Sequence, residues 1–219
     1  MVINCIWGHN GNDTLLYIEN FVGAFTRGEN LDIAISKVSD EINDYCEWAN
    51  INLPKDIVIQ IIEDYSCKLN IRDADTDVLF ESEKKSLTQN EYEILKELCL
   101  KSAHDFLQLY HSIPNKDYSN LPQRETFYGA VPRTANEMYE HTKNVNDYYF
   151  GEIGIKADND GDIFGCRKRA FEALEKMPHY LDNIIYDGSY NEQWTLRKLF
   201  RRFIWHDRIH AKAMRKLKG

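Results

Sequence analysis

The sequence lacks several features that mark common classes of protein. No stretch of about 18 consecutive apolar residues occurs, which excludes a hydrophobic transmembrane helix. The opening residues, MVINCIWGHNGNDTLLY, have neither the basic flank nor the apolar core of a signal peptide. The five cysteines are scattered, odd in number and without a CxxC pair, which favours reduced thiols over a disulfide framework. We therefore expect a cytoplasmic protein with no membrane partner.

The motifs of several common catalytic sites are missing as well. The chain contains no serine nucleophile elbow, no P-loop and no GxGxxG. The segment KADNDGD looks like the start of a calcium loop, but Lys156 and Arg167 occupy the first and last positions, where acidic ligands are needed. We interpret it as a turn, with Asp162 as the N-cap of the helix that follows.

Net charge is −8, which argues against general nucleic-acid binding. Basic residues are nevertheless concentrated in residues 194–219, which contain nine Lys/Arg and a single acidic residue, Asp207. A basic helix can contact DNA, an anionic ligand or acidic helices of its own protein, and the last interpretation is favoured. A regulator whose last helix contacts DNA is the least favoured reading, so a nucleic-acid partner is not expected.

Residues 1–80 combine strand-like and helix-like patterns. β-rich runs at 2–7 and 14–25 flank the turn signal GHNGND, and DIVIQII indicates a buried strand. Between them, apolar residues from Leu31 to Tyr45 recur at steps of three and four, which predicts one amphipathic helix with Asn30 as N-cap. We predict a small α/β domain over 1–80, followed by a short strand and a linker.

From residue 88 onward the pattern is helical. Two capping boxes mark helix starts, Thr88 with Glu91 and Thr134 with Glu137. A third helix of about fifteen residues is expected before Pro178, and a fourth is expected from Thr195. Heptad-like apolar stripes on these helices predict a four-helix bundle over 88–219. The predicted fold class is therefore α+β.

Three histidines fall on the apolar stripes of two of these helices. His206 and His210 lie on the stripe of the last helix, and His141 lies on the stripe of the second. Side chains at i and i+4 share one helical face, so two imidazoles can reach one ion, and a third leaves a coordination position open. We predict a divalent-metal site at His141, His206 and His210, with Zn²⁺ and Ni²⁺ as the first candidates, although such pairs are often ordinary core or surface residues.

The spacing also approaches a zinc-protease signature. That mechanism requires a glutamate beside the ion to activate water, whereas Asp207 is one methylene shorter and is expected to point sideways from the stripe. The protease interpretation is therefore not favoured. The other four histidines are left out of the site, and His104 in particular lies off the stripe of its helix.

Two motifs of the helical part resemble the DinB-like family. EMYEHTKNVNDYYFGEI is similar to that family's second-helix motif, and RRFIWHDRIHAKAMRK to its fourth-helix HxxxH motif. The resemblance implies an up-down-down-up four-helix bundle over 88–219, a homodimer, and metal ligands at His141, His206 and His210. It also implies a thiol S-transferase or isomerase that combines a low-molecular-weight thiol with an electrophile. Tyr148, Tyr149, Trp205 and Arg202 are candidates to line that pocket.

The first part resembles a second family. VGAFTRGENLDIAISKVSDEINDY is similar to the strand, glycine turn and helix of the HicB-like antitoxin fold, although the proline usual in that family's strand is absent. This resemblance implies that residues 1–80 bind a partner or mediate dimerisation. The alternative to an enzyme is therefore a non-catalytic metal-binding and interaction module.

Overall fold

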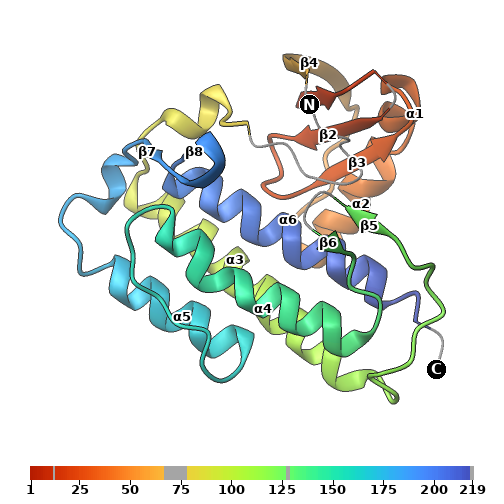
Figure 1. Cartoon of the computed structure of the whole chain (residues 1–219). Helices are drawn as coiled ribbons and strands as arrows, with labels where there is room; N and C mark the ends of the chain where they lie inside the picture. The colour runs from red at the N-terminus through yellow and green to blue at the C-terminus, as the bar shows by residue number, and fades with distance from the viewer. Residues whose placement is uncertain (12, 67–77, 127–128, 218–219) are drawn as a thin grey trace. The chain divides into compact units, whose positions relative to one another are not determined.

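The computed structural model describes residues 1–11, 13–66, 78–126 and 129–217. It combines helices with a four-stranded sheet and is a mixed α+β structure (Figure 1). The chain forms two compact units, one of Met1–Phe80 with Glu125–Gly129 and one of Glu81–Arg124 with Ala130–Gly219. Within the described residues, none of the helices has the length and apolarity needed to cross a membrane.

The first unit is a sheet covered by two helices. Its strands are β1 (Val2–His9), β2 (Thr14–Ile18), β3 (Phe25–Gly28) and β4 (Val58–Ser66), in the order β3-β2-β1-β4. The pairs β1–β2 and β2–β3 are antiparallel, and β1–β4 is parallel. Helices α1 (Leu31–Ser36) and α2 (Val38–Ala49) contribute Ala34, Val38 and Ile42 to a core that includes Ile3 and Leu16 of the sheet.

Two predictions for this unit are wrong in detail. The run 14–25 is not one strand: β2 ends at Ile18, and a turn containing Gly23 at φ +84° leads into β3. The expected single helix is interrupted at Lys37, although Asn30 caps its start as predicted. Hydroxyl groups of Ser36 and Thr26 donate to carbonyl oxygens within α1, which offers the backbone an alternative to a continuous helix.

The strand predicted from DIVIQII is present but is not buried. β4 lies at the edge of the sheet and alternates between exposed and half-buried residues, and Val58 is 63% exposed. An apolar run of this length fits a strand covered on both faces, and its neighbours in space decide whether it is covered. Part of the short strand and linker expected next lies outside the described residues, and Glu81–Lys84 forms a 3₁₀ helix, η1.

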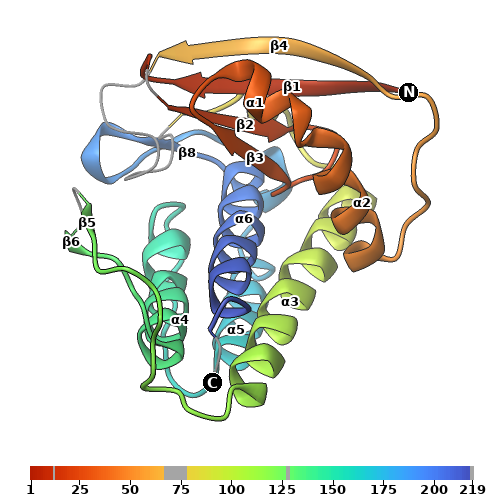
Figure 2. The same ribbon diagram turned by 90° about the vertical axis from the view of Figure 1, so that its right-hand side faces the viewer.

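The second unit contains the four long helices. These are α3 (Gln89–Ser112), α4 (Ala135–Gly151), α5 (Ile163–Leu174) and α6 (Leu196–Met214). Helix α3 contacts the other three, and α4 also contacts α5 and α6; Figure 2 shows the helices alongside one another. The short elements that lie between these helices in the sequence are β5 (Glu125–Thr126), which belongs to the first unit, β6 (Gly129–Ala130), η2 (Tyr180–Asp182), β7 (Tyr186–Asp187), η3 (Ser189–Asn191) and β8 (Gln193–Trp194).

The helix starts of this unit agree with the sequence. Both capping boxes form, at Thr88 and at Thr134, and the Asp162 side chain accepts from the Gly165 N–H. Thr195 caps α6. Helix α5 is shorter than expected, with twelve residues. These caps satisfy backbone N–H groups in the first turn of each helix and fix where it begins.

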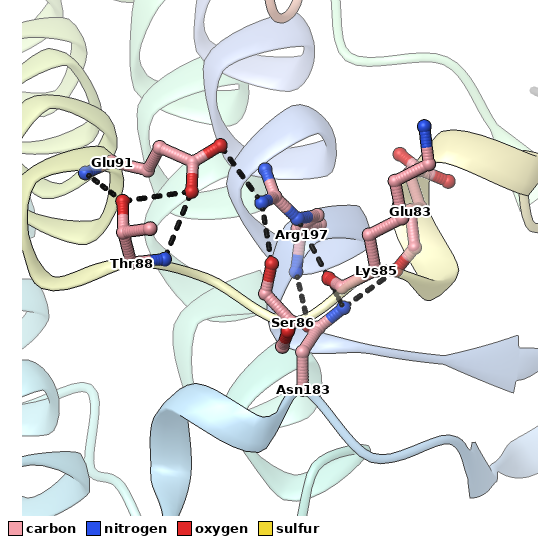
Figure 3. Close-up of polar contacts among 7 residues, drawn as sticks. All are labelled: Glu83, Lys85, Ser86, Thr88, Glu91, Asn183 and Arg197. Carbon is pink, nitrogen blue, oxygen red and sulfur yellow. Dashed lines mark hydrogen bonds and ion pairs between the residues drawn. The ribbon is translucent and has the colours of Figure 1, made fainter.

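A polar network joins the start of α3 to the start of α6 (Figure 3). The Arg197 guanidinium donates to two backbone carbonyls and to the Glu91 carboxylate, and the Asn183 amide donates to two carbonyls. The backbone N–H of Arg197 in turn donates to the side-chain oxygen Oδ1 of Asn183 at 3.0 Å. The carbonyl oxygens that accept from Arg197 and Asn183 belong to Glu83, Lys85 and Ser86.

The basic residues of α6 meet acidic residues of the same chain. Lys198 pairs with Glu192 at 3.3 Å, and Arg201 pairs with Glu83 at 2.5 Å. Both basic side chains are buried. These ion pairs agree with the interpretation that acidic residues of the same chain neutralise part of the positive charge of the last helix.

Candidate metal centre

The structure brings together the three histidines selected from the sequence. His141 comes from α4, and His206 and His210 come from successive turns of α6. One ring nitrogen from each lies within 4.8 Å of the other two, and the group could hold a metal ion. The Nε2 atoms of His141 and His206 are 3.1 Å apart. The ring centroids are separated by 4.6 to 5.0 Å.

The distance between the His141 and His206 nitrogens suits a tetrahedral ion. Two imidazole nitrogens that each lie about 2.0–2.1 Å from Zn²⁺ are roughly 3.3 Å apart when the ligand–metal–ligand angle is tetrahedral. The separation of 3.1 Å between His141 and His206 is close to that value. Three neutral nitrogen donors suit Zn²⁺, Ni²⁺ or Cu²⁺ better than the oxygen-preferring Mg²⁺ or Ca²⁺.

The three rings differ in exposure. His206 is 6% exposed, His210 is half-buried, and His141 reaches the surface. The Nδ1 atom of His206 is buried and has no hydrogen-bond partner among the described residues. The Nε2 atom of the same ring faces His141 and is the candidate ligand atom, which leaves Nδ1 to bind a water molecule. The donor set therefore fits a divalent ion that is approached from the His141 side.

The buried face of α4 is displaced by about one residue from the face predicted from the sequence. From the sequence, His141 is expected on an inward stripe with Val145 and Tyr148, but those two residues are only half-buried. The buried side of the helix carries polar residues, so counting apolar residues did not find it. Its buried residues are Ala135, Met138, Tyr139, Thr142, Asn146, Tyr149 and Phe150. His141 lies at the flank of α4 and still meets the rings of α6.

Asp207 points sideways from the histidine stripe, as expected from the sequence, and it is buried there. Its carboxylate is 1% exposed and forms an ion pair with Arg167 of α5, whose side chain is fully buried. The Ser102 hydroxyl of α3 donates to the same carboxylate at 2.6 Å. Asp207 thus links α6 to α3 and α5, and its oxygens are engaged away from the histidines. Arg167 and Ser102 were missed as partners because no local pattern joins residues so far apart in the chain.

Burial keeps all three imidazoles neutral near pH 7. Removal from water lowers the pKa of His210 to about 3, and the nearby His141 adds to this effect. The pKa of His206 is also lowered, first by burial and then by His210, His141, Arg202 and Arg167. Packing against the other two rings lowers the pKa of His141 by desolvation. Neutral imidazoles present lone pairs, which is the form that binds a metal.

The metal-free protein is expected to lose stability as the pH falls below about 6.5. The unfolded chain protonates these histidines near their ordinary pKa, whereas the folded chain does so only at lower pH, so stability falls between 6.5 and the lower folded pKa values. Urea unfolding with a chelator present, at pH 7.5, 6.5 and 5.5, measures this slope. His210→Gln should flatten it, while His104→Gln, at an exposed position, should keep the wild-type slope. If the free energy of unfolding changed equally with pH in all three proteins, the lowered pKa of His210 would be contradicted.

Arg202 and an aromatic group lie beside the histidines. The Arg202 guanidinium donates to the Tyr149 hydroxyl at 3.3 Å, and its central carbon lies 5.3 to 5.6 Å from the ring centroids of Tyr149, Trp194 and Trp205. The Tyr149 and Trp205 rings are each 6.1 Å from the His206 ring. Arg202, Tyr149 and Trp205 are among the pocket candidates that the DinB-like resemblance implies, whereas Trp194 is found only in the structure.

A separate cleft of about 670 Å³ lies elsewhere in this unit. It is lined by Asp147, Tyr148, Gly151, Glu152, Asp187, Gly188 and Ser189. Its described lining includes none of the three histidines, and its side chains offer carboxylates without a converging basic group. The histidine cluster is therefore the stronger candidate for a functional site.

Comparison of the chain with protein-family models, with curated proteins and with solved structures gave no match. The functional assignment therefore depends on the residues and their geometry.

Proposed function

We propose that this chain binds one divalent metal ion, Zn²⁺ or Ni²⁺ first among the candidates, through His141, His206 and His210. The observation that carries the proposal is the convergence of three ring nitrogens within 4.8 Å from two different helices. Their lowered pKa values keep the donors deprotonated at neutral pH. Three ligands also leave coordination space for a small molecule on the exposed His141 side.

We further propose that the bound molecule is a low-molecular-weight thiol and that the protein is a DinB-like thiol transferase or isomerase. A divalent ion with an open position lowers the pKa of a thiol that reaches it. In a transfer the sulfur forms a bond to an electrophilic carbon, the leaving group takes its electron pair, and the thiol proton passes to water. His206 and His210 place two of the three donors on one helix, α6, and the Tyr149 and Trp205 rings lie beside His206.

The wider family arrangement is part of the same proposal. The contacts among α3, α4, α5 and α6 support a bundle of these helices, for which we propose the up-down-down-up order. In the first unit, Gly28 supports the HicB-like interpretation of the strand, turn and helix, because a Cβ there would lie 2.8 Å from the Ala34 nitrogen. We propose a homodimer for the intact chain, which light scattering after size-exclusion chromatography tests directly.

Metal analysis of protein purified without a histidine tag tests the function. We expect about one divalent ion per chain, and conjugation of a panel of thiols to a chromogenic aryl halide that stops on chelation and resumes when Zn²⁺ or Ni²⁺ is returned. The same protein re-supplied with Mg²⁺ is the control and should stay inactive. Metal without conjugation would favour the non-catalytic metal-binding module, and protein that takes up no metal would overturn the site itself.

A further inference from the structure

The cleft of about 670 Å³ is lined by two segments of the second unit that both carry carboxylates. The C-terminal end of α4 contributes Asp147 and Glu152, and β7 contributes Asp187. The described lining contains no lysine, arginine or histidine. The volume lies in the range of pockets that bind small molecules. A small ligand in this cleft therefore meets negative charge from both segments.

Glu152 is a buried carboxylate without a cationic partner among the described residues. The residue is 9% exposed, and its Oε2 accepts from the backbone N–H of Ser189 at 2.7 Å. Within the described part of the chain, its Oε1 has no hydrogen-bond partner. Removal of a charge from water is costly, so buried carboxylates are ordinarily paired. The Glu152 carboxylate therefore favours a cation that enters the cleft.

The other buried carboxylates of this unit show the ordinary arrangement. Glu83, Glu192 and Asp207 are each paired with a buried basic side chain of the same chain. Of the buried acidic residues described in this unit, Glu152 differs in that it lines a cleft and pairs with no basic side chain. The difference points to a cation from outside the chain.

The end of α4 strengthens this preference. The C-terminal end of a helix carries a partial negative charge, which basic side chains commonly offset. The last turn of α4 contains no basic residue, Asp147 lies near it, and Glu152 is the C-cap. These two carboxylates therefore add to the negative charge of the helix end. A departure from local preference of this kind is expected at a binding site.

The spacing of the carboxylates favours an organic cation over a metal ion. In the described residues, the side chains spaced to hold a metal ion are those of the histidine cluster, and Asp147, Glu152 and Asp187 are not among them. An extended molecule with two ammonium groups can instead reach carboxylates on both segments. Tyr148 also lines the cleft, and aromatic rings attract ammonium groups.

We propose that this cleft binds a small organic diamine or polyamine, with one ammonium group at Glu152 and another at Asp187. The site is separate from the histidine cluster, and binding there requires no metal ion. Gly188 gives the Glu152 carboxylate its place, because a Cβ at residue 188 would overlap its Oε2 atom. The Ser189 N–H holds the same oxygen, which leaves Oε1 for the ammonium group.

Isothermal titration calorimetry of the full chain with 1,5-diaminopentane and with its neutral isostere 1,5-pentanediol tests the inference. At pH 7 and about 0.15 M NaCl, where long-range attraction is screened, we expect submillimolar binding of the diamine and no detectable binding of the diol. Glu152→Gln keeps an acceptor for the Ser189 N–H but removes the charge, and it should weaken diamine binding about tenfold or more. Chelator-treated and Zn²⁺-supplied protein should bind the diamine equally, which separates the cleft from the histidines.

Glu140→Gln is the matched control. It makes the same change of charge on α4, at a side chain that is 56% exposed and outside the cleft lining, and should keep wild-type affinity. If Glu152→Gln does not fold, Asp187→Asn at an exposed position should weaken binding severalfold in its place. Equal weakening by Glu140→Gln would report net charge alone and overturn the inference. Wild-type protein that binds no diamine, or that binds Mg²⁺ more tightly than the diamine, would overturn it as well.

Discussion

Replacing Asp207 with alanine is expected to lower the free energy of unfolding by about 3–5 kcal/mol. The Asp207 carboxylate and the Arg167 guanidinium are 1% and 0% exposed, so the variant leaves a buried cation without its partner. The Ser102 hydroxyl loses its acceptor on Asp207 as well. Urea unfolding monitored by circular dichroism, at pH 7 and with a chelator present, measures the loss.

The matched control removes both charges of this ion pair. The double variant Asp207→Ala with Arg167→Met no longer buries an unpaired cation, and it should recover much of the stability lost by Asp207→Ala alone. A loss below about 1 kcal/mol for the single variant is typical of an exposed ion pair and would contradict the buried geometry.

Replacing His206 with alanine is expected to weaken metal binding by about a hundredfold or more. Loss of a residue that only orients a ligand already costs about 10- to 100-fold in affinity, and His206 is the most buried of the three proposed ligands themselves. Competition against a chromophoric chelator at pH 7.5 measures the dissociation constant of Zn²⁺ for each protein.

His104→Ala is the matched control for this loss. His104 belongs to α3, its side chain is 52% exposed, and it lies outside the cluster. The control should bind Zn²⁺ with wild-type affinity, and circular dichroism should show that both variants stay folded. Equal weakening by the two substitutions would indicate non-specific binding to surface histidines and would remove the basis of the proposed function.

The helix starts of the second unit could be predicted because their signals are local. Thr88 and Thr134 each bond to a glutamate three residues further on, and the four residues of such a box suffice to identify it. His206 and His210 could be predicted as a pair because residues four apart in one helix lie on the same face.

Features that depend on distant residues could not be predicted in this way. The buried face of α4 contains Thr142 and Asn146, and the Asn146 amide NH2 donates to the Asp158 carbonyl, which lies beyond the helix. The partner of Asp207 lies forty residues away on another helix. Likewise, the exposure of β4 follows from its place at the edge of the sheet, which its own composition does not reveal.

The network around Arg197 has a consequence for how this sequence can drift during evolution. Its acceptors at residues 85 and 86 are backbone carbonyls, so the side chains of Lys85 and Ser86 can be exchanged without loss of those hydrogen bonds. The donors are side chains, and no other residue type supplies the paired donors of Arg197 or the amide of Asn183 at those places. Sequence change is therefore tolerated at residues 85 and 86 and resisted at Arg197 and Asn183.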